Sequence, residues 1–376
     1  MQGFPQGAGS SAEAPARHGG NLVQAAARLG CRPGQILDAS ASLVPFGPPL
    51  ALRAALLAAP LRPYPDRDHT SLRRALARHH GLDPGQVLPG NGAAELFTWA
   101  ARDAAATGCS LLGAPGFADY QRALACWGGA WSHWTLPLRW SGPGPQAFPP
   151  GPEGTGREGL GAGALWITNP HNPTGQLWSR ASLEPLLERF ALVICDEAFL
   201  SLVPGGEAQS LIPLVARHPN LVVVRSLTKL FAIAGLRLGY AVADPQRLAR
   251  WAAWRDPWPV NSLAGAVGEI ALDQGRWIRR VQTWVGGEGP WLGQRLAELP
   301  GLVPLPSAAN FLLVRGERGG QPWSLEPLRL ALEHGHRILL RDCRSFHGLD
   351  ASWLRVGLQD RRGNRRLLRA LGQELG

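Results

Sequence analysis

Ser226, Thr228 and Lys229 have the clearest capacity for chemistry in this 376-residue sequence. They follow the run 221–225, four apolar residues and an arginine, which is typical of a buried strand. Open α/β sheets bind ligands at the carboxyl ends of their strands. A lysine held out of water loses its proton readily, so Lys229 could form a Schiff base with a carbonyl compound. The two hydroxyls, with Arg237 eight residues after the lysine, would suit a phosphate group. The alternative interpretation is a surface lysine in a strand–helix loop.

Asn172 and Asp196 each follow a further predicted strand, at 165–168 and 192–195. A helix predicted at 182–190 would return the chain in parallel, so both residues are expected at the same sheet edge. Prolines restrict the turn around Asn172, whose amide could donate to a phenolate oxygen. A buried carboxylate is costly unless paired, and a pyridinium nitrogen about 4 Å from Asp196 would give a gross attraction of roughly 4 kcal/mol at an effective dielectric of about 20. A plain proline turn and a helix-capping aspartate are the alternatives.

The small residues Gly92, Ala93 and Ala94 open another predicted helix. Small side chains let backbone N–H groups approach a phosphate at a helix N-terminus. Because glycine-rich turns before helices are common, this segment is not diagnostic by itself.

Short apolar runs alternating with helical segments must position all these residues. The strand candidates are 165–168, 192–195, 221–225 and 239–243. Such alternation predicts a parallel sheet covered by helices. The Gly- and Pro-rich stretch 141–164 is interpreted as a long surface loop. From about residue 266, a long helical stretch followed by strands at 310–315 and 354–358 indicates a smaller α/β domain.

The order of these features resembles that of fold-type I enzymes dependent on pyridoxal 5′-phosphate (PLP), the aspartate aminotransferase superfamily, over nearly the whole chain. The resemblance implies PLP as cofactor and an α/β fold, with a large domain on a mostly parallel seven-stranded sheet and a smaller α/β C-terminal domain. The expected division is 1–49 as an N-terminal segment packing with the small domain, 50–265 as the large PLP-binding domain and 266–376 as the small domain.

Within this superfamily the sequence resembles the threonine-phosphate decarboxylase branch of cobalamin (cobamide) biosynthesis, whose sister family is the histidinol-phosphate aminotransferases. The segments 18–21 (HGGN), 38–42 (DASAS) and 45–49 (PFGPP) carry this resemblance. Ser42 and Ala39 depart from the branch, which usually has asparagine and phenylalanine there. Two activities follow as expectations: decarboxylation of L-threonine O-3-phosphate to (R)-1-aminopropan-2-ol phosphate, or amino transfer, as in histidinol-phosphate aminotransferase.

The resemblance also implies residue roles. Lys229 would hold the cofactor as a Schiff base, Asp196 would face the ring nitrogen and Asn172 the ring hydroxyl. The other implied cofactor-binding residues are Gly92, Ala93, Ala94, Phe117, Ser226, Thr228 and Arg237, with Tyr64 reaching across from the partner subunit of a homodimer. The implied substrate-binding residues are His18, Gly19, Ser42, Asn172, Arg341 and Arg355. Arg355 would bind the substrate carboxylate, and Arg341 its phosphate or carboxylate region.

Composition argues against several other classes of protein. The formal charge is +10, but the densest basic group, Arg361 to Arg369, is interpreted as the solvated face of a helix, without an aromatic platform for nucleic acid. The five cysteines have no zinc spacing, so no metal site is expected, and their odd number fits a reducing compartment. With no signal-peptide core near the start and no membrane-length apolar run, we expect a cytoplasmic enzyme that binds neither nucleic acid nor membrane.

Two non-enzymatic alternatives use the same fold. A PLP-binding regulator would carry a DNA-binding domain, and we expect no room for one before residue 20 or after the small domain. A degenerate binding protein would lack catalytic groups, whereas Lys229, Asp196, Asn172 and Arg355 are all present.

Overall fold

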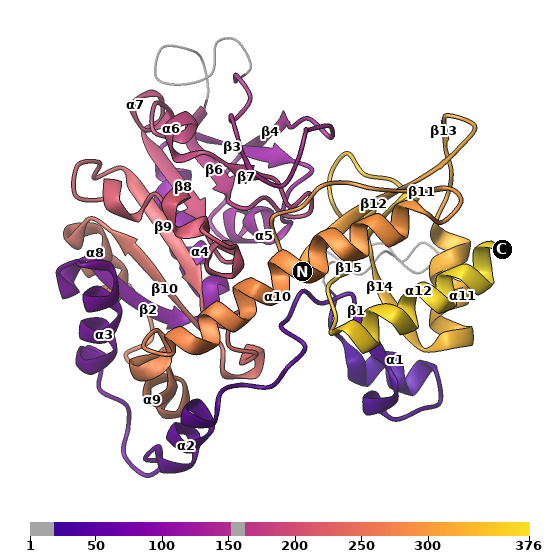
Figure 1. The fold of residues 1–376 in the computed structure, drawn as a ribbon. Helices are drawn as coiled ribbons and strands as arrows, with labels where there is room; N and C mark the ends of the chain where they lie inside the picture. The colour runs from indigo at the N-terminus through magenta and orange to yellow at the C-terminus, as the bar shows by residue number, and fades with distance from the viewer. Residues whose placement is uncertain (1–18, 152–161) are drawn as a thin grey trace, which may run out of the picture.

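The computed structural model describes residues 19–151 and 162–376, which form two lobes (Figure 1). The larger lobe is built on a seven-stranded sheet of order β2-β10-β9-β8-β6-β3-β4. Its strands are β2 (Val87–Asn91), β3 (Cys109–Ala114), β4 (Trp131–Thr135), β6 (Ala162–Thr168), β8 (Leu192–Asp196), β9 (Leu221–Ser226) and β10 (Leu238–Ala243). Only β10 runs antiparallel to its neighbours in this sheet. The predicted mostly parallel seven-stranded sheet is therefore confirmed.

Helices cover both faces of this sheet, which explains why its central strands are apolar throughout. Alternate residues of a strand point to opposite faces. Val193 and Cys195 of β8 join one core cluster, and Ile194 joins the other. The helices packed on the sheet are α3 (Thr70–His80), α4 (Gly92–Ala106), α5 (Asp119–Ala125), α8 (Pro245–Trp254) and α9 (Ser262–Ala271). Because both faces are buried, the strand ends are where polar side chains can meet a ligand.

The smaller lobe contains a six-stranded sheet with a core of its own. Its strands are β1 (Leu37–Ala39), β11 (Leu302–Pro304), β12 (Phe311–Arg318), β13 (Gln321–Pro322), β14 (Ile338–Asp342) and β15 (Trp353–Gly357). Strand β1 pairs in parallel with β14, so residues 37–39 join a sheet made otherwise of C-terminal segments. The helices are α1 (Leu22–Arg28), α11 (Glu326–His336) and α12 (Arg361–Leu375), and α10 (Gly275–Ala297) runs along both lobes (Figure 1). The domain boundaries at 49/50 and 265/266 remain predictions.

Three local predictions were wrong in part. The helix predicted at 182–190 is two short helices, α6 (Arg180–Leu183) and α7 (Leu186–Arg189), separated at Pro185, which lacks an N–H to continue the first helix. The stretch 141–164 is not all loop. Its strand β5 (Pro145–Gln146) pairs with β7 (Leu177–Trp178), and residues 162–164 belong to β6. Residues 152–161 lie outside the described part of the chain.

The third concerns the arginine-rich face of α12, whose arginines are mostly exposed as predicted, but one of them also joins two helices. The guanidinium of Arg361 lies 3.8 Å from the ring centroid of Trp291, and its Nε donates to Glu288 at 2.8 Å. This arginine therefore ties α12 to α10.

In the described ranges, no helix has the length and apolar character needed to span a membrane. The same ranges contain no cluster of three or more metal-ligating side chains.

Candidate active site

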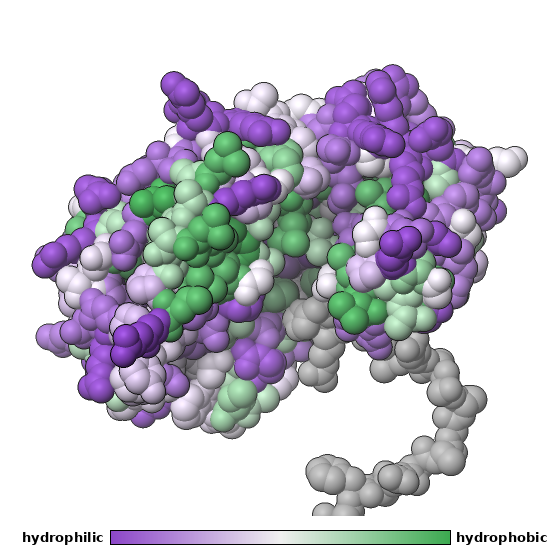
Figure 2. All heavy atoms as spheres, turned by 90° about the horizontal axis from the view of Figure 1, so that it is seen from below, coloured by the Kyte–Doolittle hydropathy of each residue, from purple (hydrophilic) through white to green (hydrophobic). Residues whose placement is uncertain are grey.

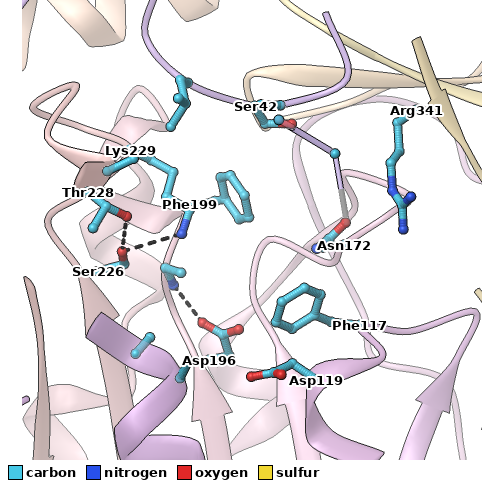
Figure 3. Close-up of a pocket in the computed structure, with 18 of the residues that line it drawn as sticks. Ser42, Phe117, Asp119, Asn172, Asp196, Phe199, Ser226, Thr228, Lys229 and Arg341 are labelled. Carbon is cyan, nitrogen blue, oxygen red and sulfur yellow. Dashed lines mark hydrogen bonds between the residues drawn. The ribbon is translucent and has the colours of Figure 1, made fainter. Parts of the chain in front are cut away.

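A cavity of about 380 Å³ lies between the two lobes, at the carboxyl ends of β8 and β9 (Figure 3). It brings together most of the residues that the sequence predicted for a site. These are Gly19, Ser42, Ala93, Ala94, Phe117, Asn172, Asp196, Ser226, Thr228, Lys229, Arg237, Arg341 and Arg355. They come from both lobes, so the site is formed only when the lobes pack together.

Lys229 extends its amino group into the middle of this cavity (Figure 3). Its Nζ lies 3.5 Å from the Ser226 hydroxyl, which in turn lies 2.7 Å from the Thr228 hydroxyl. Burial lowers the pKa of the Lys229 amine below that of a free lysine, and Arg237 and Arg355 lower it further, while Asp196 raises it. The lowered pKa makes the neutral amine, which is the form that attacks a carbonyl group, easier to reach than in a free lysine.

Lys229 is also the only lysine in the sequence: of 38 Lys and Arg residues, 37 are arginine. Arginine can replace lysine wherever a positive charge is enough, but its guanidinium does not lose its proton in proteins. A single lysine at the end of a buried strand therefore points to amine chemistry. This count is a signal that the sequence carries independently of any motif spacing.

Asp196 is buried at the end of β8 and points toward the cavity (Figure 3). Burial raises the pKa of its carboxyl group above the usual range. Hydrogen bonds from the Tyr120 hydroxyl (2.6 Å) and the Ala198 backbone N–H (2.9 Å) act in the opposite direction, as does the Lys229 charge. A carboxylate held in this way suits a cationic partner in the cavity, such as a protonated ring nitrogen.

The start of α4 forms a confined pocket for an anion. The backbone at Gly92 has a φ of +73°, and a Cβ there would come within 2.7 Å of the Arg237 guanidinium. A Cβ at Gly239 would lie 2.8 Å from the Ala93 backbone nitrogen. The backbone N–H groups at the start of α4 therefore lie close to the Arg237 guanidinium, in a space too small for a further side chain. The hydroxyls of Ser226 and Thr228 line the same cavity. This donor set matches a phosphate monoester.

We expect Gly239→Ala to weaken this pocket, because the new methyl group would press on backbone atoms that cannot move aside cheaply. The cost is about 1–3 kcal/mol of overpacking, seen as a lower melting temperature and a higher dissociation constant for PLP. Gly235→Ala is the matched control, since a Cβ there meets nothing within 4 Å. Equal behaviour of the two variants would contradict this account of the pocket.

Two arginines face the cavity from neighbouring strands of the smaller lobe. Arg341 on β14 and Arg355 on β15 are directly opposite in the sheet, and both are buried. Arg355 donates to the Asn172 side-chain oxygen at 2.5 Å and to the Ser40 carbonyl at 3.2 Å. Burial lowers the pKa of Arg355 to about 10, and the charge of Arg341 contributes to the lowering. Such a pair of buried cations suits a ligand with two anionic groups.

Ser42 lines the same cavity as this arginine pair. Its hydroxyl is buried and has no hydrogen-bond partner among residues 19–151 and 162–376, and the same holds for Nε of Arg355. Buried polar atoms are normally paired, so these two atoms are suited to contact a bound ligand.

Sequence analysis missed several residues of the site. Tyr120, on α5, reaches Asp196 although no motif marks it. Ser345 accepts a hydrogen bond from Arg341 at 2.6 Å, and Asp119 and Phe346 line the cavity. Tyr120 meets Asp196 across 76 residues of sequence, so local spacing gave no signal for it. Ser345 lies only four residues after Arg341, and that spacing was a signal that could have been used.

Three predicted residues are not among those lining the cavity. Gly92 lies just outside it, against Arg237. Tyr64 is exposed and stacks on Trp258, with ring centroids 4.4 Å apart. His18 lies outside the described residues.

Known proteins resemble this chain over most of its length. A family model described as aminotransferase class I and II matches residues 48–371. The threonine-phosphate decarboxylase of Salmonella typhimurium is 37% identical over 370 residues, which cover 94% of this chain and 95% of that protein. The histidinol-phosphate aminotransferase of Roseiflexus castenholzii is 34% identical over 308 residues, 80% of each chain. The crystal structure of L-threonine-O-3-phosphate decarboxylase from Porphyromonas gingivalis is 26% identical, with a TM-score of 0.76 over 90% of this chain and 99% of that one.

These comparisons confirm the resemblance seen in the sequence and the predicted fold class. Enzymes of the matched family depend on PLP, so the cofactor prediction is confirmed as well. The donor set at α4 and β9 fits the phosphate of this cofactor, and Asp196 fits its ring nitrogen.

Proposed function

This chain belongs to the aminotransferase class I and II family, and on that basis we propose that it decarboxylates L-threonine O-3-phosphate to (R)-1-aminopropan-2-ol phosphate, a step of cobalamin biosynthesis. The observation that carries this proposal is the buried pair Arg341 and Arg355, opposite one another and facing the cavity. Threonine phosphate has two anionic groups, a carboxylate and a phosphate, and the two guanidinium groups match them. Similarity to the Salmonella decarboxylase supports the same substrate class.

The proposed roles follow from the contacts at the site. PLP, when bound, withdraws the electrons of one bond to the substrate Cα. Lys229 holds the cofactor between turnovers and is placed to return a proton to Cα after the carboxylate has left as CO₂. Asp196 keeps the ring nitrogen protonated, and Asn172, fixed by Arg355, faces the ring hydroxyl. Arg341, Arg355 and Ser42 orient the substrate, and this orientation determines which Cα bond is broken.

An aminotransferase activity is the second candidate, favoured by the similarity to the Roseiflexus enzyme. Glutamate, a common amino donor, carries two carboxylates that the same arginines could bind. In that reaction Lys229 would move the Cα proton to the cofactor instead. The described residues serve both outcomes, so the substrate must be tested directly.

The test mixes purified holoenzyme with L-threonine O-3-phosphate and follows CO₂ release and the amine product by mass spectrometry. We expect CO₂ and amine in equal amounts, with the cofactor remaining in its aldehyde form. Unphosphorylated threonine is the control and is expected to react far more slowly, because it lacks one of the two anions. Absence of CO₂, together with amino transfer from glutamate or histidinol phosphate, would establish the alternative.

We also propose that two copies of the chain pair, with Tyr64 of each copy reaching the cofactor phosphate of the other. Apolar side chains of α2 (Leu50–Ala58) and the segment after it are exposed, Leu57 by 91%. This helix lies at the bottom of Figure 1, and the face seen from below in Figure 2 carries a broad apolar area on the larger lobe. Exposed apolar areas of this kind commonly mark interfaces. A monomeric holoenzyme in analytical ultracentrifugation would contradict this pairing.

A further inference from the structure

Tyr120, on α5, is hydrogen-bonded to Asp196 but is not among the residues that line the cavity. Its hydroxyl lies 2.6 Å from one Asp196 oxygen and 2.8 Å from the Thr168 hydroxyl. Thr168 and Asp196 are paired at the ends of neighbouring strands β6 and β8, so a side chain from α5 can reach both at once. The hydroxyl is fully enclosed, and burial with the nearby Asp196 charge raises the pKa of Tyr120 well above its ordinary value. Tyr120 is therefore a neutral hydrogen-bond donor.

The directions of these hydrogen bonds follow from counting protons. A phenol has a single O–H, which Tyr120 donates to the Asp196 carboxylate. The Thr168 hydroxyl must then donate to the Tyr120 oxygen, because that oxygen has no second proton to give. Thr168 therefore donates to Tyr120, and Tyr120 donates to Asp196. Both hydrogen bonds stabilise the negative charge on the Asp196 carboxylate. The other Asp196 oxygen accepts from the Ala198 backbone N–H.

We propose that Tyr120 is a positioning residue that keeps Asp196 ionised and oriented toward the cofactor ring nitrogen. The inference rests on the role proposed above for Asp196. A proton shared between a carboxylate and a ring nitrogen moves toward the nitrogen when other donors stabilise the carboxylate. Tyr120 therefore acts through Asp196 on the proton of the ring, without touching substrate.

The surroundings of Asp196 show why this donor matters. Burial opposes ionisation of the carboxyl group, and the neighbouring Asp119 opposes it too. The groups that favour ionisation are Tyr120, the Ala198 N–H and Lys229, in decreasing order. Lys229 loses its charge when it forms a Schiff base with the cofactor and that link is not protonated, whereas the Tyr120 bond does not change. Among the side chains around Asp196, Tyr120 therefore lowers the pKa of its carboxyl group the most.

The test replaces Tyr120 by phenylalanine and reads the protonation of the ring directly. The Tyr120 ring packs against Phe97, Phe117 and Trp166, with centroids 5.0–5.5 Å away, and phenylalanine keeps these contacts. Holoenzyme loaded with ring-¹⁵N-labelled PLP is measured by nitrogen NMR. In Tyr120→Phe we expect the ¹⁵N resonance of the ring to move toward the position of an unprotonated nitrogen. We also expect the dissociation constant of PLP to rise by about 10- to 100-fold, which corresponds to the usual contribution of a hydrogen bond to a charged group.

Tyr240→Phe is the matched control, since it removes a second buried tyrosine hydroxyl, one that contacts His80 and not the cavity. Its ¹⁵N resonance and PLP affinity are expected to equal those of the wild type. Thr168→Val removes only the outer donor and is expected to give a smaller shift in the same direction, which keeps the proposal testable if Tyr120→Phe does not fold.

The outcomes separate this inference from the function on which it rests. An unprotonated ring in the wild-type holoenzyme would remove the role of Asp196 itself. A protonated wild-type ring that stays protonated in Tyr120→Phe and Thr168→Val, with unchanged PLP affinity, would overturn the inference and leave that role intact. In an Asp196→Asn background, the Tyr120→Phe change is expected to have no further effect on the ¹⁵N resonance, because the group through which it acts is gone; an independent shift there would also overturn it.

Discussion

We expect Lys229→Arg to abolish covalent retention of PLP and to reduce the rate of product formation by at least about 10²- to 10⁴-fold, the usual contribution of a positioned proton-transfer group alone. Arginine keeps a positive charge at this position but cannot lose a proton to become a nucleophile. The change therefore separates the chemistry of the amine from its charge. Phosphate binding at α4 is expected to survive, because the donors there are other residues.

The measurement is reduction of the holoenzyme with borohydride, followed by intact-mass and peptide analysis. Because Lys229 is the only lysine, a stable adduct has just one side-chain amine to form on, and the chain's α-amino group is the one competing amine. We expect one adduct on the Lys229 peptide of the wild type and none in Lys229→Arg. Ser226→Ala is the control and is expected to keep the adduct at saturating PLP, since it removes a neighbour of the amine and one phosphate donor but leaves the amine itself in place. A label confined to the α-amino group would remove the basis of the proposed function.

Asp196→Asn is expected to reduce kcat by about 10²- to 10³-fold. The gross attraction between this carboxylate and a protonated ring nitrogen is roughly 4 kcal/mol at an effective dielectric of about 20, and each 1.4 kcal/mol is about a factor of ten in rate. Asparagine has nearly the same size but carries no negative charge. Its single oxygen can still accept from the Ala198 N–H, while its NH₂ can donate to the Tyr120 oxygen if the Tyr120 hydroxyl turns to donate to Thr168, so the packing is expected to persist.

Asp119→Asn is the matched control for this result. Asp119 lines the same cavity, but its carboxylate is paired with the Arg122 guanidinium at 2.5 Å. We expect its loss to reduce kcat by less than about tenfold, because its carboxylate is paired with Arg122 and its remaining charge opposes the ionisation of Asp196 instead of supporting it. The measurements are steady-state rates at saturating PLP and melting temperatures, and we expect the melting temperatures of both variants to equal that of the wild type. Equal losses in the two variants would mean that general negative charge, and not Asp196 in particular, supports the reaction.

Much of the catalytic set could be predicted because strands and their ends are local features of a sequence. The runs before Asn172, Asp196 and Lys229 are apolar and short, and each became a buried strand of the same sheet. Parallel strands end at a common edge, so the three polar residues had to approach one another. The count of lysines carries a further signal, since a chain that uses arginine at 37 other basic positions keeps one amine at this edge.

The sequence by itself determined the sheet, the edge at which the proposed chemistry would occur and the one side-chain amine available for it, because these depend on short-range patterns and on side-chain chemistry. Only the tertiary structure decided which distant groups support that edge. Arg355 meets Asn172 across 183 residues of sequence, Tyr120 meets Asp196 across 76, and Gly239 leaves room for the backbone at Ala93. Such contacts depend on how strands and helices pack in three dimensions, and no local periodicity encodes them.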